Sequence, residues 1–328
     1  AEPRRRRTAT VREQFPVLAL PLRVQLAEAL ANAGRGGEAA REYLAAVPGA
    51  PAQDALEWSR RAAEQYLISG HVDEGMEALH SVLRMAGMEL PGTPRKALLW
   101  LLARRAHLRL RGLRFRERPA SQVPAEQLLR IDTCWSVAIG LALVDLIRGT
   151  EFQARHLLLA LRAGEPYRVA RALALEAGYT AVAGGASWPR TERLLRTTMA
   201  LAERVGHPHA VGLATFNAGA AAQCNGRFRE AVVLCDRAEA ILRERATGVA
   251  WEIDSSTIFG VHAISWRGDW NEVERRLPRL IRDAEERGDL YAASYWHTRQ
   301  AYLLHLRDDE PARAREQERH GMALWSRR

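Results

Sequence analysis

A helix-turn-helix signature that recurs about every 40 residues constrains the fold of this chain more than any other sequence feature. In each copy an amphipathic segment ends at a glycine, and a glutamate followed by a small or apolar residue comes four and five positions later. The clear copies begin at Gly34, Gly70, Gly226 and Gly268, a looser copy begins at Gly149, and Gly184 lies in a further helix-breaking stretch.

Each part of the signature has a physical reason. Glycine at a helix end adopts the left-handed conformation that closes the last turn, and glutamate in the next helix's first turn meets the positive end of its dipole. The small residue lets the two helices approach closely. Ala, Leu and Arg supply 145 of 328 residues, which favours an all-α fold.

The periodicity predicts seven helical hairpins and one helix that interrupts the series. A hairpin cannot bury its apolar stripe alone, so neighbouring hairpins must stack. We expect a basic connecting segment over residues 1–12, a single helical-repeat solenoid over 13–328, and a long basic helix inserted at about 94–118. The segment 108–116 also alternates with period two, so an extended end of this helix is the alternative. The helix pairs are predicted at 20–33 and 38–47, 52–69 and 72–87, 125–148 and 151–163, 167–183 and 189–205, 209–225 and 228–244, 251–267 and 270–287, and 289–306 and 310–326.

The repeats resemble tetratricopeptide repeats at the positions where the second helix of each hairpin crosses its neighbours. This resemblance implies an α-solenoid wound as a right-handed superhelix, with a concave face lined by the first helices. The consensus tryptophan and terminal proline of that family are mostly missing here. The matching positions are Ala39, Tyr43 and Ala46 in one repeat, Gly75, Leu79 and Val82 in the next, and Ala231, Cys235 and Ala238 in a later one.

A second resemblance extends over most of the chain. Residues 131–136, 152–166 with 168–172, and Trp251 with Glu252 are similar to the C-terminal helical region of large bacterial serine/threonine protein kinases that carry an AAA-type signalling ATPase module. The resemblance implies that the kinase and ATPase parts lie upstream of Ala1 and that residues 1–12 connect the domains. It carries over no catalytic residue.

Several chemistries are excluded by their missing motifs. Lys96 is the only lysine, and its neighbours match neither a phosphate-binding Gly-Lys-Ser/Thr loop nor a kinase strand lysine. The three cysteines form no Cys-x-x-Cys pair, so a disulfide framework or zinc knuckle is not expected. We therefore predict a cytoplasmic chain with no enzyme activity, no cofactor, no signal peptide and no membrane span.

The concave face is the predicted binding surface. A peptide or partner domain would lie along inward positions of the first helices, and the two arginines among them would meet carboxylates. The positions are Arg60, Glu64, Arg171, Phe216, His262, Trp266 and His297.

A dense run of arginines is the second candidate site. The formal charge of the chain is +9, and residues 94–118 alone contribute +8 while residues 1–12 contribute +4. The run could bind phosphates or anionic headgroups. The competing hypothesis is a core-facing stripe of Leu98, Leu102, Ala106, Leu110 and Leu113, with the arginines forming a solvated face or pairing with acidic neighbours. The candidate anion-binding residues are Arg104, Arg105, Arg109, Arg111, Arg114, Arg116 and Arg118.

Other polar clusters in the sequence do not predict a metal or catalytic site. His207 and His209 with Cys224 would make an incomplete metal site, so packing and helix-start roles are favoured. His297 and His305 lie two helical turns apart, too far to bind one ion together. Surface or capping roles are favoured over acid–base catalysis for three scattered carboxylates. They are Asp132, Asp145 and Glu151.

The sequence thus predicts a non-catalytic protein-interaction, sensor or scaffold module of a multidomain kinase and ATPase. Its partner would be a protein or peptide, or the upstream domains of the same polypeptide. The alternative is the helical-repeat tail of an ATPase-type transcription regulator that contacts nucleic acid through residues 104–118.

Overall fold

The computed structural model describes residues 16–142 and 144–325, and the only regular structure in these ranges is helical. The predicted basic connecting segment at 1–12 lies outside the described residues. The helices are α2 (Pro16–Asn32), α3 (Gly36–Ala46), α4 (Ala52–Ile68), α5 (Val72–Met85), α6 (Pro94–Arg111), α7 (Ala125–Leu141), α8 (Leu146–Ala163), α9 (Pro166–Ala181), α10 (Trp188–Val205), α11 (Pro208–Cys224), α12 (Phe228–Arg245), α13 (Ala250–Trp266), α14 (Trp270–Arg287), α15 (Leu290–Tyr295), η3 (Trp296–Ala301), α16 (Tyr302–Arg307) and α17 (Pro311–Leu324), with short helices η1 (Ala120–Gln122) and η2 (Gly185–Ser187).

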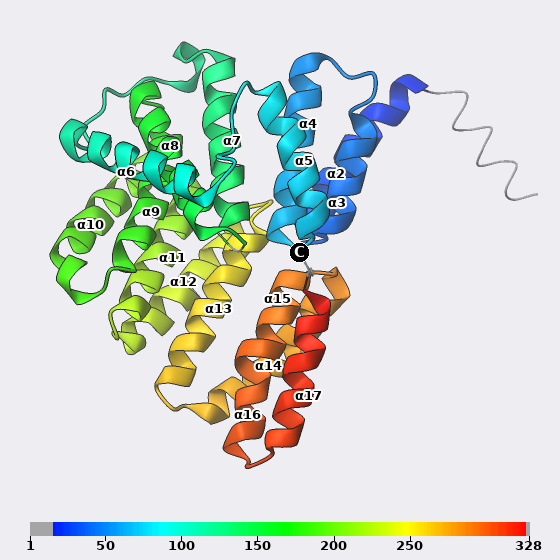
Figure 1. Cartoon of the computed structure of the whole chain (residues 1–328), viewed down its shortest axis with the longest axis vertical. Coiled ribbons are helices and arrows are strands. Elements are labelled where there is room, and N and C mark those ends of the chain that lie inside the picture. Colours follow the sequence, from blue (N-terminus) through cyan, green and yellow to red (C-terminus); the bar gives the residue numbers. More distant parts are fainter. Residues whose placement is uncertain (1–15, 143, 326–328) are drawn as a thin grey trace, which may run out of the picture.

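Helices that follow one another along the chain pack as pairs, as the repeat signature predicts (Figure 1). The backbone has positive φ at Gly34, Gly70, Gly226 and Gly268, where the first helix of each pair ends. The crossing positions named from the sequence are buried; Tyr43, Leu79 and Cys235, for example, are at most 2% exposed. An all-α chain of paired helices consistent with an α-helical repeat is therefore confirmed.

The turn predicted at Gly149 is wrong. The polypeptide turns earlier, and α8 begins at Leu146 because the Asp145 carboxylate accepts a hydrogen bond of 3.0 Å from the backbone N–H of Arg148. Gly149 lies inside α8, where a Cβ would come within 3.0 Å of the backbone nitrogen of Ala142. This glycine serves close helix packing and does not end a helix.

The inserted basic helix is shorter than predicted. It ends at Arg111, followed by Gly112 with φ of 70°, so the expectation of a helix reaching about residue 118 is wrong. The chain then continues as an extended segment along the end of α8. There the backbone N–H of Arg118 donates a 2.9 Å hydrogen bond to the carbonyl of Gly164.

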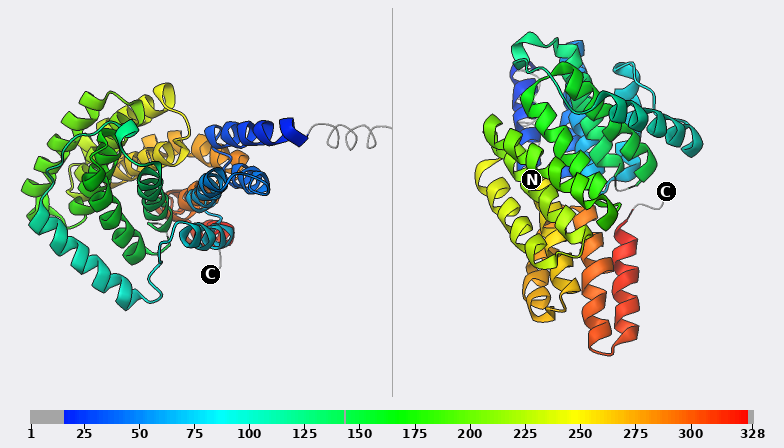
Figure 2. Two further views of the ribbon diagram at one scale, coloured as in Figure 1. Left: turned by 90° about the horizontal axis from the view of Figure 1, so that it is seen from above. Right: turned by 90° about the vertical axis from the view of Figure 1, so that its left-hand side faces the viewer.

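The helical pairs follow a curve that brings the last pairs back to the first. In Figure 2, seen from above, the orange helices α14 and α15 lie close to the blue helices α2 to α5. The backbone N–H of Leu290 donates a 2.9 Å hydrogen bond to the carbonyl of Ser69. A Cβ on Gly70 would lie 2.6 Å from the backbone nitrogen of Tyr291. These contacts close the curve between two regions 220 residues apart in sequence.

Candidate binding site in the centre of the curve

A cavity of about 470 Å³ lies where the first helices meet later ones. Its size is within the range of small-molecule and peptide-side-chain sites. The wall comes from α2, α3, α4, α7, α9, α11 and α13 and from the two turns before α11 and α13. It is lined by Glu28, Ala31, Asn32, Tyr43, Arg60, Arg61, Glu64, Gln65, Trp135, Tyr167, Arg171, His207, His209, Thr247, Gly248, Val249 and Glu252.

Arg60 on α4 organises one side of the cavity. Its guanidinium donates to Glu57 at 2.7 Å and to Glu64 at 2.7 Å, one turn away on either side. A third bond of 2.6 Å reaches the Ser136 hydroxyl on α7. Arg60 is only 9% exposed, and bidentate pairing of this kind keeps a buried guanidinium charged. The network fixes α4 against α7.

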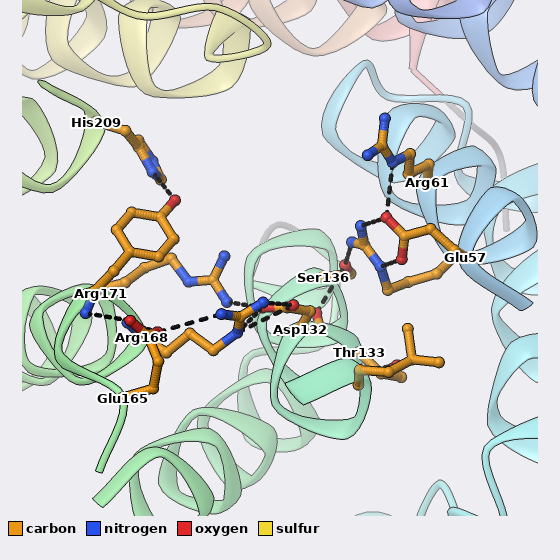
Figure 3. A network of polar contacts seen from close by, with 12 residues as sticks. Glu57, Arg61, Asp132, Thr133, Ser136, Glu165, Arg168, Arg171 and His209 are labelled. Atoms are coloured by element: carbon orange, nitrogen blue, oxygen red, sulfur yellow. Dashed lines mark hydrogen bonds and ion pairs between the residues drawn. The ribbon is translucent and has the colours of Figure 1, made fainter. Parts of the chain in front are cut away.

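Arg61 faces the opening of the cavity. Its side chain is 39% exposed, and its guanidinium forms ion pairs with Glu57 at 2.7 Å and with Glu28 of α2 at 3.0 Å. It also donates to the Tyr43 hydroxyl of α3 at 3.3 Å (Figure 3 shows Arg61 with Glu57). Arg61 therefore joins α2, α3 and α4. It is the most exposed of the three arginines that line the cavity.

Asp132 on α7 binds Arg171, the α9 arginine that lines the cavity. Arg168 and Arg171 of α9 both donate to it, each with a contact of 2.5 Å (Figure 3). Burial alone would raise the pKa of Asp132, but the attraction of Arg171 and the hydrogen bonds from Arg168 outweigh it and lower the pKa to about 2. The carboxylate stays ionised and holds two helices together.

Arg171 has a second role inside the cavity. Its guanidinium lies 4.6 Å from the ring centre of Trp135, a cation–π geometry, while the side chain is 7% exposed. Its Nε is buried and has no hydrogen-bond partner within the part of the chain that the structure describes. The cavity wall thus contains a polar atom that its own residues leave unsatisfied.

A chain of hydrogen bonds completes the far wall. The Tyr167 hydroxyl lies 2.7 Å from Nδ1 of His209, and Nε2 of His209 lies 2.9 Å from a carboxylate oxygen of Glu252. These contacts connect α9, α11 and α13. Burial raises the pKa of Tyr167, so its hydroxyl keeps its proton and can donate.

The cavity wall is electrostatically balanced. Three arginines face three glutamates among the lining residues, and each arginine already pairs with a carboxylate of the chain. The wall also carries Tyr43, Trp135 and Tyr167. A ligand that both donates and accepts hydrogen bonds fits such a wall better than a multiply charged anion.

The structure brings three of the seven concave-face residues predicted from sequence to the cavity, namely Arg60, Glu64 and Arg171. The other four lie elsewhere. Phe216 is 5% exposed and packs edge-on against Trp251 and Phe259.

Two of the remaining residues form an outer pair. His262 accepts a 2.7 Å hydrogen bond from the indole of Trp266, which is 64% exposed and stacks on Phe228. His297 is buried in the last hairpin beside Glu285.

Two of the seven candidate anion-binding arginines neutralise buried acids. Arg104 pairs with Glu151 at 2.9 Å, and that carboxylate is fully buried. Arg105 forms an ion pair with Glu176. The competing hypothesis of pairing with acidic neighbours describes these two arginines.

Two further arginines cap α8. Arg111 donates to the carbonyl of Leu161 at 3.1 Å, and Arg118 donates to the carbonyl of Ala163 at 2.8 Å. Both satisfy carbonyls at the negative end of the helix dipole. They are therefore committed to packing the extended segment onto α8.

The predicted leucine stripe of α6 is wrong. Leu98, Leu102 and Leu110 are 46%, 58% and 90% exposed, and Leu113 and Ala106 are exposed as well. The helix is rotated because its ion-paired arginines must face the buried acids. Ala97 and Leu108 make the inward contacts instead, at 0% and 7% exposure. Of the seven candidate anion-binding arginines, three remain exposed with no ion-pair partner in the described ranges, namely Arg109, Arg114 and Arg116.

The three scattered carboxylates have structural roles. Asp145 caps α8, as the sequence favours. Asp132 and Glu151, in contrast, are not surface groups, because each is enclosed by arginines.

The histidine and cysteine positions do not converge. Cys224 is at the opposite end of α11 from His209, roughly 22 Å along the helix. The helix-start role is confirmed for His207, whose Nδ1 accepts from the backbone N–H of His209 at 3.3 Å. Sequence reasoning missed Tyr167, His209 and Glu252 as parts of one polar chain.

Comparison with known proteins gives no family assignment. A scan of the sequence against models of protein families finds no match, and no curated protein matches it. Among the helices that the structure describes, none has the combined length and apolar character needed to cross a bilayer.

Proposed function

We propose that this chain is a non-catalytic binding module that senses a ligand or partner segment in its central cavity. The hairpins would wind as a right-handed, tetratricopeptide-like solenoid. The observation that carries the proposal is the position of the cavity: one ligand there would touch α2, α3 and α4 on one side and α9, α11 and α13 on the other. Binding would therefore favour the closed curve over an opened one.

The chemistry of the wall narrows the ligand. Arg60 and Arg171 are buried and already bound to carboxylates, so a partner carboxylate would have to displace a strong internal pair. Arg61, with 39% exposure, is the accessible contact. The ligand class supported best is a small polar molecule, or the end of a peptide, that offers donors and acceptors together with an apolar surface for the aromatic side chains.

The resemblance to the C-terminal regions of bacterial serine/threonine kinases supports a role for this module as one part of a longer signalling protein. We infer that it reports ligand binding to kinase and ATPase domains of a longer cytoplasmic polypeptide. Restraint of those domains requires a contact that is made in only one of two states. The closing contact between Ser69 and Leu290 supplies a candidate for such a contact, because it joins two hairpins that lie far apart in the sequence.

The test compares autophosphorylation and ATP hydrolysis by the longer protein with and without residues 16–325. A change in either rate is expected, and it should depend on the closing contact. The absence of any change would contradict regulation. Kinase and ATPase motifs in the reading frame upstream of Ala1 would support the family assignment, and their absence would refute it.

The nucleic-acid alternative has less support. Four of the seven arginines proposed to contact phosphates are bound within the protein, two by acids and two by helix carbonyls. The remaining three would release few counterions, so affinity for DNA would be weak and only mildly salt-dependent.

A further inference from the structure

The last hairpin contains an irregular helix that the repeat signature does not predict. One helix was expected over 289–306, but the structure divides it into α15, a π-helical segment over Trp296–Ala301, and α16. A π-helical turn carries an extra residue, and such turns are frequent at functional sites because they redirect side chains. His297 is the second residue of this segment and one of its buried residues.

His297 is held at both ring nitrogens. It is 6% exposed, and its Nε2 lies 3.0 Å from a carboxylate oxygen of Glu285 on α14. Its Nδ1 makes a hydrogen bond with the side-chain amide of Gln317 on α17. A metal-binding histidine donates its other ring N–H to an acceptor, so with the Gln317 amide oxygen turned toward Nδ1 the ring would keep Nε2 free for an ion.

A second histidine comes from α17. The ring of His320 stands perpendicular to that of His297, at 89°, with the ring centres 4.7 Å apart. The close approach depends on Gly321, since a Cβ there would lie 2.6 Å from the Cβ of His297. This contact lets α17 come near enough to place two imidazoles side by side.

The three side chains have the geometry of a metal site. One ligand atom from each of Glu285, His297 and His320 lies within 4.8 Å of the others. Two imidazoles bound to one tetrahedral zinc ion, with Zn–N bonds of about 2.0–2.1 Å, have ring centres about 5 Å apart. The observed separation is close to that value. Because Glu285 and His320 are exposed, small rotations can bring their ligand atoms inward.

We propose that Glu285, His297 and His320 bind a zinc-class divalent transition-metal ion, with water at the remaining position. Two imidazoles and a carboxylate suit zinc and its neighbours, whereas magnesium and calcium prefer oxygen ligands alone. Gln317 is the positioning residue. The ion would join α14, the π-helical segment and α17, and so fix the final helix of the repeat.

The site differs from the pair considered in the sequence. His305 contacts Glu310 at 3.4 Å, while His297 meets His320 and Glu285. Without a metal ion, the same cluster would be a histidine hydrogen-bonded to a carboxylate, with a second histidine packed edge-on against it. The two descriptions differ in whether zinc binding depends on His320.

The experiment titrates ZnCl₂ into the full chain, free of any histidine tag, by isothermal calorimetry. We expect one zinc per chain, no response to MgCl₂, and a rise in melting temperature of roughly 5 °C at a hundredfold excess over the Kd. His320→Gln should weaken binding at least tenfold, and Gln317→Leu should weaken it about 10- to 100-fold. The matched control is His305→Gln in the same hairpin, which should bind as the wild type does.

Three results would overturn the proposal. They are no zinc binding by the folded wild-type chain, equal affinity in His320→Gln, and an equal loss in His305→Gln. His297→Gln is not needed for the decision, because its burial could impair folding. Glu285→Gln, at an exposed position, gives a second test in which weaker zinc binding with an unchanged circular dichroism spectrum is expected.

Discussion

Replacing Asp132 by Asn should remove the anchor between α7 and α9 without changing the size of the side chain. The pKa of this carboxyl is lowered to about 2, compared with about 3.9 for an ordinary aspartate. Each pKa unit corresponds to about 1.4 kcal/mol, so the ionised form gains about 2.5 kcal/mol net, after the cost of burial is set against the attraction of the surrounding arginines. The side chain is 18% exposed, so solvent screening reduces this value only modestly.

The contribution of Asp132 has a defined pH dependence. A carboxyl whose folded-state pKa is lowered adds stability above its unfolded pKa and loses it as the pH falls through the folded value. The difference in unfolding free energy between wild type and Asp132→Asn should therefore be about 2–3 kcal/mol at pH 7. It should shrink as the pH falls from about 4 to about 2.

Urea unfolding followed by tryptophan fluorescence at several pH values measures this difference. The matched control is Asp236→Asn, which breaks a pair with Arg276 in which the carboxylate is 42% exposed. An exposed pair of this kind is worth about 0–1 kcal/mol. The reasoning would be refuted if Asp132→Asn were as stable as wild type at pH 7, or if both variants lost the same amount.

Two further predictions concern the closing contact and the thiols. Gly70→Ala should be more destabilising than Gly226→Ala, because both have positive φ but only Gly70 would place a Cβ against α15; urea midpoints of the two variants compare them, and equal midpoints would count against the closing contact. Cys224 should react first with a thiol reagent, because burial raises the pKa of both Cys134 and Cys235 to about 12. Equal labelling rates of the three cysteines in the folded chain would contradict that order.

The helix boundaries were largely predictable because their signals are local. Gly34 and Gly226 end helices by their own conformation, and Pro94 and Pro208 stand in a first turn where a proline fits. The turn predicted at Gly149 was wrong because glycine also occurs inside helices where two helices pack closely. A glycine in sequence does not distinguish the two uses.

The rotation of α6 was not predictable from its own pattern. Its leucines suggested an inward stripe, but the exposed face carries Leu98, Leu102 and Leu110. What decides the rotation is the burial of Glu151 and Glu176, which lie roughly 50 and 70 residues further along the chain and require arginines. Such pairing depends on tertiary contacts that periodicity does not contain.

The cavity was predictable only in part. Arg60 and Arg171, two of the inward first-helix positions predicted for the concave face, lie on its wall. The chain from Tyr167 through His209 to Glu252 was missed, because it forms only when the curve brings α9, α11 and α13 together.

The most direct test of the central claim is ligand-observed NMR with a panel of amino acids, short peptides, saccharides and nucleotides. At least one class should bind the wild-type chain with a Kd below about 1 mM, where the binding free energy is about −4 kcal/mol. Arg61→Ala should weaken that binding at least tenfold, while Arg276→Ala, at a paired arginine outside the cavity, should leave it unchanged. The claim would be contradicted if no member of the panel bound, or if Arg61→Ala bound the same compound as tightly as the wild type.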